Sequence, residues 1–147
     1  MNFKGHLITG FVVGILFIII THLFFGWFDY NLKLVGIYII IISIYCLLPD
    51  SDLRNSTISY VFIAISIIGM MIGYNYDDIK ILYSSFTLLV VTFIAWNIKH
   101  RGFIHSIVFN IIVSAPLIYF FSYEVAALAF ICFYSHLIAD KLYFKLI

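Results

Sequence analysis

The chain carries long apolar runs separated by short polar segments. Six such runs cover residues 7–25, 34–49, 58–74, 81–96, 104–121 and 125–139. The runs are too continuous for the alternation of a half-buried strand, and lipid offers no hydrogen-bond partners to the backbone, so each run is expected to be a helix. About 20 residues of helix cross a hydrocarbon core, and aromatic flanks extend the shorter runs to the interface. The pattern predicts an all-α polytopic transmembrane bundle of about six spans, formed by a single domain over residues 1–147.

The composition supports a membrane location and excludes some partners. Hydrophobic residues make up 65% of the 147 positions and charged residues only 10%, against about 45–50% and about 25% in soluble domains. The sequence therefore predicts a multi-pass protein of the cell membrane, with membrane lipids as neighbours. The net charge is +1 and no basic run occurs, so nucleic acid is not an expected partner. Cys46 and Cys132 lie inside apolar runs, and we interpret them as packing residues.

The distribution of basic residues predicts the orientation in the membrane. With six spans, both termini share one side with the loops at 50–57 and 97–103. Six of the eight Lys and Arg residues lie on that side, namely Lys4, Arg54, Lys99, Arg101, Lys141 and Lys145. Only Lys33 and Lys80 lie on the other side, together with the acidic residues Asp29, Asp77, Asp78 and Glu124. The positive-inside rule then places both termini in the cytoplasm.

Most of the histidines, and half of the aspartates, fall on this same predicted side. These residues arrive from four separate parts of the chain: His6, then Asp50 and Asp52, then His100, Arg101 and His105, then His136 and Asp140. Ionisable groups in a membrane domain are costly and by default mark function. Any one of them could be an interfacial residue or a helix cap. Their gathering on one side instead predicts a site.

Local spacing indicates a metal site. His136 and Asp140 are four residues apart, so they share one helix face. Pro49 ends the second predicted helix just before Asp50, and Ser106 is placed to cap the fifth. Imidazole and carboxylate ligands together suit Zn²⁺, Mn²⁺ or Fe²⁺. We expect His105, His136 and Asp50 to approach a common point.

Other polar residues do not fit this site. His22 lies about 24 Å along a helix from His6, so we interpret it as interfacial. Asp77 and Asp78 fall on the opposite predicted side and are typical of a solvated turn.

Four motifs give the chain a family resemblance. They are the early His6, Leu-Pro-Asp-Ser-Asp at 48–52, His-Arg-Gly-Phe-Ile-His-Ser at 100–106 and Ser-His-Leu-Ile-Ala-Asp at 135–140. With these motifs, the chain resembles the membrane-bound metal-dependent hydrolases, also described as LexA-binding, inner-membrane-associated hydrolases. The resemblance covers most of the chain and implies a multi-helix hydrolase of the inner cell membrane. Members often carry a His directly after the second Asp, where this chain has Leu53. No residue here encodes LexA binding recognisably.

The leading interpretation is a metal-dependent hydrolase acting at the cytoplasmic membrane face. The expected ligands of one or two ions, most simply zinc, are His6, Asp50, His105, His136 and Asp140. Asp52, the candidate general base, and His100 would be further ligands or proton-transfer groups, and Arg101 would orient a substrate phosphate. The location favours an amphiphilic substrate such as a phospholipid or another phosphoester.

Two alternatives belong to other functional classes. The same cluster could be the mouth of a metal-ion or proton pathway, although a transporter should also carry strongly polar groups at mid-span. The mid-span polar residues here are of Ser, Thr, Asn and Gly type, including Asn110 and Ser114. The third class is a membrane scaffold in which a metal only joins the helices.

Overall fold

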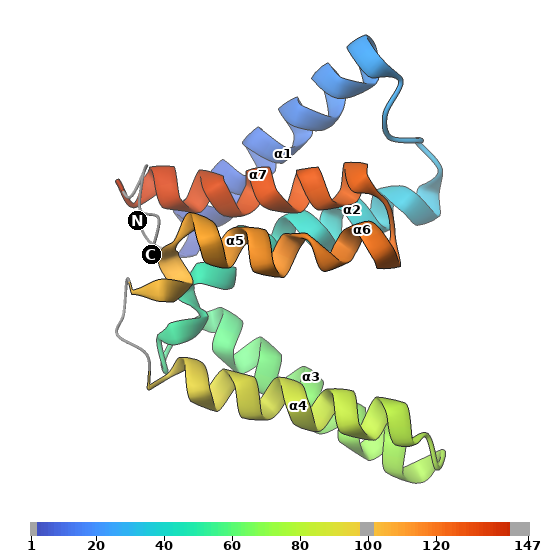
Figure 1. The fold of residues 1–147 in the computed structure, drawn as a ribbon, viewed down its shortest axis with the longest axis vertical. Helices are drawn as coiled ribbons and strands as arrows, with labels where there is room; N and C mark the ends of the chain where they lie inside the picture. Colours follow the sequence, from blue (N-terminus) through green and yellow to red (C-terminus); the bar gives the residue numbers. More distant parts are fainter. Residues whose placement is uncertain (1–2, 98–101, 142–147) are drawn as a thin grey trace. The chain divides into compact units, whose positions relative to one another are not determined.

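The computed structural model describes residues 3–97 and 102–141, and these residues form helices and turns with no β-strand. The helices, in chain order, are α1 (Phe3–Phe25), α2 (Leu32–Tyr45), the 3-10 helix η1 (Leu48–Asp52), α3 (Thr57–Asn75), α4 (Ile79–Ala95), the 3-10 helix η2 (Phe103–His105), α5 (Ile107–Ser114), α6 (Pro116–Phe120) and α7 (Tyr123–Ala139) (Figure 1). The all-α prediction is confirmed, and each of the six apolar runs contains a helix.

Two of the runs end or break where the sequence carries proline. The second run was expected to be helical up to Pro49, but α2 ends at Tyr45 and the chain tightens into η1. The fifth run is not one helix, because Pro116 lacks an N–H and begins the separate helix α6. The predicted cap of the fifth run is confirmed: the Ser106 side chain accepts from the Phe109 N–H at 3.1 Å, so α5 begins at Ile107.

The chain divides into two compact units, each described by itself below. Unit 1 comprises Met1–Pro49 and Arg101–Ile147, and unit 2 comprises Asp50–His100. The single-domain prediction is not tested by this division and stays a prediction.

Helix α7 is the centre of unit 1, since it contacts α1, α2, α5 and α6. Its residues Leu128, Ala129, Cys132 and Phe133 are fully buried. Helix α1 packs closely against α2 and the residue that follows it through Gly10 and Gly14, which are one helical turn apart. A Cβ at Gly10 would collide with the Cβ of Cys46, and a Cβ at Gly14 would lie 2.9 Å from Ile42 side-chain atoms. Small residues at such spacing let membrane helices pack tightly.

Polar side chains also join the helices of unit 1. The Tyr45 hydroxyl donates to the Val113 carbonyl oxygen at 2.7 Å, and the Asn110 amide donates to the Phe130 carbonyl oxygen at 3.0 Å. Ser114 in turn donates to the Asn110 side-chain oxygen at 3.0 Å. Asn110 and Ser114, the mid-span polar residues noted in the sequence, therefore take part in helix packing.

Unit 2 is a hairpin of α3 and α4, and its close approach also uses two glycines one turn apart. A Cβ at Gly69 would collide with the Ser85 hydroxyl, and a Cβ at Gly73 would lie 2.6 Å from the backbone nitrogen of Leu82. At the open end of the hairpin, the Ser59 hydroxyl donates toward the carbonyl oxygens of Ser51 and Leu53, both at 2.9 Å. It also accepts from the Trp96 indole N–H at 3.3 Å.

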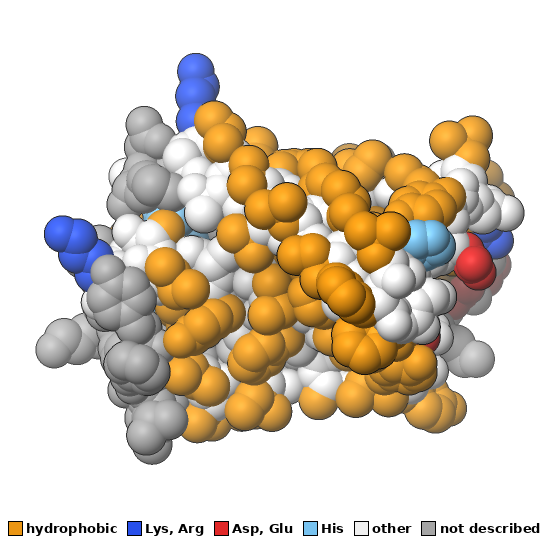
Figure 2. Space-filling view, turned by 90° about the horizontal axis from the view of Figure 1, so that it is seen from above, with side chains coloured by type: hydrophobic (Ala, Val, Ile, Leu, Met, Phe, Trp, Pro, Cys, Tyr) orange, Lys and Arg blue, Asp and Glu red, His pale blue; other side chains and the backbone are white. Residues whose placement is uncertain are grey.

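The outer surface is compatible with lipid. Figure 2 shows hydrophobic side chains covering the middle of the visible face, with charged side chains toward its ends. Two of the described helices, Phe3–Phe25 and Thr57–Asn75, are long and apolar enough to cross a membrane, and four further apolar helices are shorter. The count of six spans and the cytoplasmic placement of both termini stay predictions.

Candidate metal centre

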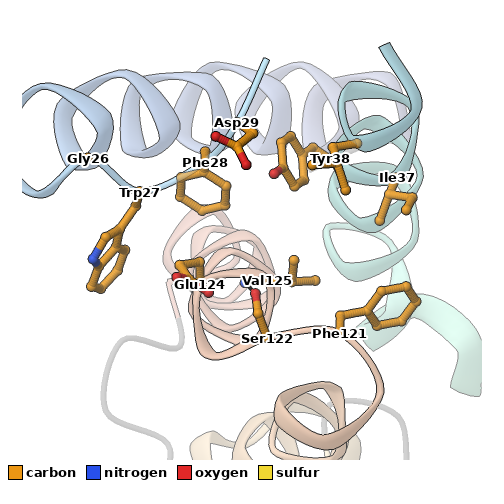
Figure 3. Close-up of a pocket in the computed structure, with 11 residues that line it drawn as sticks. Gly26, Trp27, Phe28, Asp29, Ile37, Tyr38, Phe121, Ser122, Glu124 and Val125 are labelled. Atoms are coloured by element: carbon orange, nitrogen blue, oxygen red, sulfur yellow. Dashed lines mark hydrogen bonds between the residues drawn. The ribbon is translucent and has the colours of Figure 1, made fainter. Parts of the chain in front are cut away.

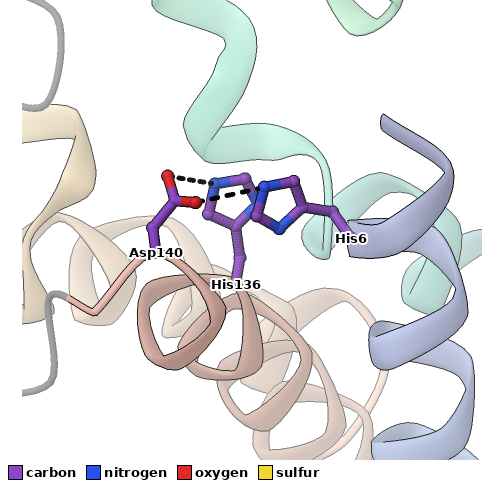
Figure 4. A group of neighbouring side chains, drawn as sticks. All are labelled: His6, His136 and Asp140. Carbon is purple, nitrogen blue, oxygen red and sulfur yellow. Dashed lines mark ion pairs between the residues drawn. The ribbon is translucent and has the colours of Figure 1, made fainter. Parts of the chain in front are cut away.

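Three predicted ligands from opposite ends of the chain meet at one end of unit 1. His6 lies in the first turns of α1, His136 in the last turn of α7, and Asp140 at the C-cap of α7. Their candidate ligand atoms all lie within 4.8 Å of one another, and both histidines are buried. The two carboxylate oxygens of Asp140 face different rings: Oδ1 is 3.3 Å from His6 Nε2, and Oδ2 is 3.8 Å from His136 Nε2 (Figure 4).

The end of α2 fixes the orientation of His136. The Nδ1 atom lies 2.8 Å from the carbonyl oxygen of Cys46. Because a carbonyl oxygen only accepts hydrogen bonds, Nδ1 carries the proton, and the neutral ring has its lone pair on Nε2, the atom nearer to Asp140. A backbone carbonyl that holds the far nitrogen of an imidazole is a common supporting contact of metal-binding histidines.

His105 adds a third imidazole to the group. It ends η2 and is fully buried, and its ring centroid lies 5.5 Å from that of His136 at an interplanar angle of 63°. We call His6, His105, His136 and Asp140 the histidine cluster. Its side chains are supplied by α1, η2 and the end of α7.

The donor set and spacings of the histidine cluster fit a transition metal. Two ligand atoms bound to a tetrahedral zinc at about 2.0–2.1 Å lie about 3.4 Å apart. The two nitrogen–oxygen separations at Asp140, 3.3 and 3.8 Å, bracket that value. The rings of His6 and His136 are stacked with centroids 3.7 Å apart and an interplanar angle of 12°. Two imidazolium cations would repel at this distance, so the stacking favours neutral rings, the form that binds metal.

The charge on Asp140 is stabilised. Burial by itself raises the pKa of this carboxyl, but favourable interactions outweigh burial and hold the pKa below its ordinary value. The cluster therefore presents an ionised carboxylate beside two imidazoles.

The remaining predicted site residues lie in unit 2 or outside the residues that the structure describes. Asp50 is half-buried and Asp52 is buried in η1, and both belong to unit 2. The expected approach of Asp50 to His105 and His136 therefore stays a prediction. His100 and Arg101 lie outside the described residues.

Residues set aside from the sequence stay apart from the histidine cluster. His22 lies near the other end of α1, where its Nδ1 donates to the carbonyl oxygens of Trp27 and Phe28 at 2.8 and 3.1 Å. Cys46 and Cys132 are buried and are not joined in a disulfide, in agreement with a packing role. The sequence did not indicate the Cys46 carbonyl, since a backbone group leaves no residue-type signal. The Gly-x-x-x-Gly spacings at 10–14 and 69–73 are the sequence signal of the close helix contacts described above.

Comparison with known proteins gives a family. A family model described as YdjM inner membrane protein matches residues 1–144. No curated protein and no solved structure matches the chain. The match spans nearly the whole chain and agrees with the predicted location in the inner membrane and with the apolar helices. The chain therefore belongs to the YdjM inner membrane protein family.

Proposed function

We propose that this inner-membrane protein is a metal-dependent hydrolase whose ion or ions are held by the histidine cluster. The observation that carries the proposal is the convergence of His6, His136 and Asp140, with ligand atoms within 4.8 Å. Burial supports the proposal, because burying an ionisable group in a membrane protein is costly and such groups by default mark a functional site. A divalent transition metal at such a site supplies Lewis acidity and lowers the pKa of a water molecule to about 7.

The ring arrangement bears on how many ions are held. An imidazole lone pair lies in the plane of its ring, and the rings of His6 and His136 are nearly parallel. One ion shared by both rings would require them to rotate apart. Two ions, one for each ring, require no rotation, because each oxygen of Asp140 already faces a different ring. The geometry therefore favours two ions, which His6, His136 and Asp140 would hold together, and Asp50 and His105 remain proposed as additional ligands.

The protein's own groups would orient a metal ligand, transfer protons and bind the substrate phosphate. The Cys46 carbonyl keeps the His136 proton on Nδ1 and so keeps Nε2 available for the ion. Asp52 stays the proposed general base, His100 a proton-transfer group, and Arg101 the group that orients a phosphate. A site at the end of membrane helices suits an amphiphilic phosphoester, with phospholipids as the first class to test.

Metal content of the purified full-length protein tests the binding step. We expect about two zinc, manganese or iron ions per chain by elemental analysis, and substantial loss in His6→Ala and His136→Ala. His22→Ala is the matched control, since His22 lies on α1 outside the cluster, and it should retain full metal. Equal metal in all of these variants would refute the assignment of the ligands. One ion per chain would refute only the two-ion arrangement.

Activity distinguishes hydrolysis from the other classes. The metal-loaded protein should hydrolyse at least one member of a panel of phospholipids and soluble phosphoesters, and Asp52→Asn should abolish turnover while keeping most of the metal. Loaded protein that hydrolyses nothing would favour the structural-metal alternative. Metal or proton flux in vesicles that is lost in His136→Ala would favour the transporter.

A further inference from the structure

A second feature of unit 1 lies at the end of α1 and α7 opposite to the histidine cluster. Here an open cavity of about 340 Å³ is lined by the loop after α1, the first turns of α2, and the start of α7 (Figure 3). Glu124 in its wall precedes His136 by 12 positions, which is about 18 Å along α7. The cavity is therefore separate from the proposed metal centre and does not depend on it.

The lining of the cavity combines aromatic rings with carboxylates. Trp27, Phe28, Tyr38 and Phe121 contribute aromatic side chains, and Asp29 and Glu124 contribute the acidic groups. Three other cavities described in this structure are lined by apolar, hydroxyl and tyrosine side chains, with no carboxylate. A groove filled only by lipid chains would have a lining without carboxylates, as these three cavities do. The lining of aromatic rings and carboxylates requires a different occupant.

The charge of this cavity is not neutralised within the described part of the chain. No ion pair links Asp29 or Glu124 to a Lys, Arg or His there; the ion pairs seen among the described residues are those of Asp140 with His6 and His136. Two carboxylates beside a cavity with low-dielectric walls focus a negative potential on it. The favoured ligand therefore carries positive charge.

The backbone around the cavity is held in shape. Phe28 has a left-handed backbone (φ 64°), which a non-glycine residue rarely adopts without support from its surroundings. Its ring is buried and packs edge-on against Tyr38, with centroids 5.1 Å apart. The His22 imidazole donates to the carbonyl oxygens of Trp27 and Phe28 from the other side. These contacts preorganise the loop that carries four of the lining residues, Gly26 to Asp29.

We propose that this cavity binds an alkylammonium group. Aromatic faces attract organic cations through the ring quadrupole, and aromatic cages with nearby carboxylates suit ammonium groups that retain apolar substituents. A compact metal ion would gain nothing from the aromatic walls. The volume of about 340 Å³ lies at the small end of ligand pockets, about 300–1,000 Å³, and matches an amine headgroup. The ammonium comes either from a lipid headgroup or from a soluble amine.

The test is calorimetric titration of the full-length protein in a non-ionic maltoside detergent. The probes are tetramethylammonium, ethanolamine, dihexanoyl phosphatidylethanolamine and dihexanoyl phosphatidylglycerol. Saturable binding of the ammonium probes, with none of phosphatidylglycerol, is expected. Tighter binding of phosphatidylethanolamine than of ethanolamine identifies a lipid headgroup as the source, and the reverse order identifies a soluble amine. Absence of binding by every ammonium probe would overturn the proposal.

Variants locate the binding. Asp29→Asn and Glu124→Gln should each raise the dissociation constant about fivefold, because each removes one nearby charge. Asp77→Asn is the matched control: it removes an exposed carboxylate of unit 2 at a left-handed position (φ 52°) that Asn tolerates. Asp29→Glu combined with Glu124→Asp keeps the charges and should bind. An unchanged dissociation constant in the doubly neutralised, fully helical protein would assign these aromatics to the membrane interface alone and overturn the proposal.

Discussion

The two units bury different kinds of polar side chain. In unit 2 the buried polar residues described on α3 and α4 are hydroxyls, and those of Ser66 and Thr92 donate to the carbonyl oxygens of Phe62 and Leu88 in their own helices at 2.7 and 2.8 Å. In unit 1 the buried polar residues include three imidazoles that face groups on other helices. A hydroxyl that donates to a carbonyl oxygen of its own helix needs no hydrogen-bond partner from another helix. Imidazoles on different helices come together only when those helices pack against each other. The same holds for the side chains of a functional site.

The same comparison shows what the units share. Each brings helices together through two glycines one turn apart, Gly10 and Gly14 in unit 1 and Gly69 and Gly73 in unit 2. Close packing is therefore common to both units, whereas the histidine cluster lies in unit 1 alone. Each unit also carries one of the two tryptophans, Trp27 in unit 1 and Trp96 in unit 2. Single-tryptophan proteins can follow the unfolding of each unit separately.

The largest expected effect is at Gly10. Gly10→Val would push α1 away from Cys46, and we expect a loss of about 3 kcal/mol in the unfolding free energy of unit 1, at the upper end of overpacking costs. Gly36→Val is the control, because a Cβ at Gly36 meets nothing within 4 Å. The measurement is detergent-induced unfolding followed by Trp27 emission in a Trp96→Phe background. Metal binding should fall with Gly10→Val, since His6 lies one turn away on α1. Equal stability of both variants would contradict the packing described for α1.

A smaller effect is expected in unit 2. Gly73→Val places a side chain against the backbone of Leu82, which cannot move aside, and should weaken the α3–α4 hairpin by about 2 kcal/mol. Trp96 emission in a Trp27→Phe background reports it. The metal held by His6, His136 and Asp140 should be retained, because all three belong to unit 1. Loss of that metal in Gly73→Val would show that metal retention depends on the packing of unit 2 and would contradict this expectation.

The smallest effect separates two serines of α3. Ser59→Ala removes bonds to Ser51, Leu53 and Trp96 and should cost about 1 kcal/mol, the usual size for a polar contact between membrane helices. Ser66→Ala removes only a bond to its own helix and should change stability by a few tenths of a kcal/mol. Both are measured through Trp96 emission. Ser59 bonds to other segments of unit 2, whereas Ser66 bonds only within its own helix. Equal stability of the two variants would show that this difference does not affect stability.

Periodicity and spacing predicted much of this molecule and missed specific parts of it. The pairing of His136 with Asp140 followed from four-residue spacing on a helix, and the Ser106 cap from residue type. The meeting of His6 with that pair followed from the shared side deduced from basic residues. The parallel stacking of the two rings could not be predicted, because it depends on side-chain rotamers set by tertiary packing. The break at Pro116 was predictable in principle, but the apolar run of 104–121 concealed it.

The hydrogen bond from His136 to Cys46 has a consequence for how the protein can vary. The acceptor is a main-chain oxygen, so the identity of residue 46 matters only through its small size beside Gly10. What keeps that oxygen accessible is the unwinding of α2 beyond Tyr45, ahead of Pro49. If the α-helix continued, the same oxygen would accept the N–H of residue 50 instead. The orientation of the imidazole therefore depends on where α2 ends, a property of the backbone and not of the side chain at position 46.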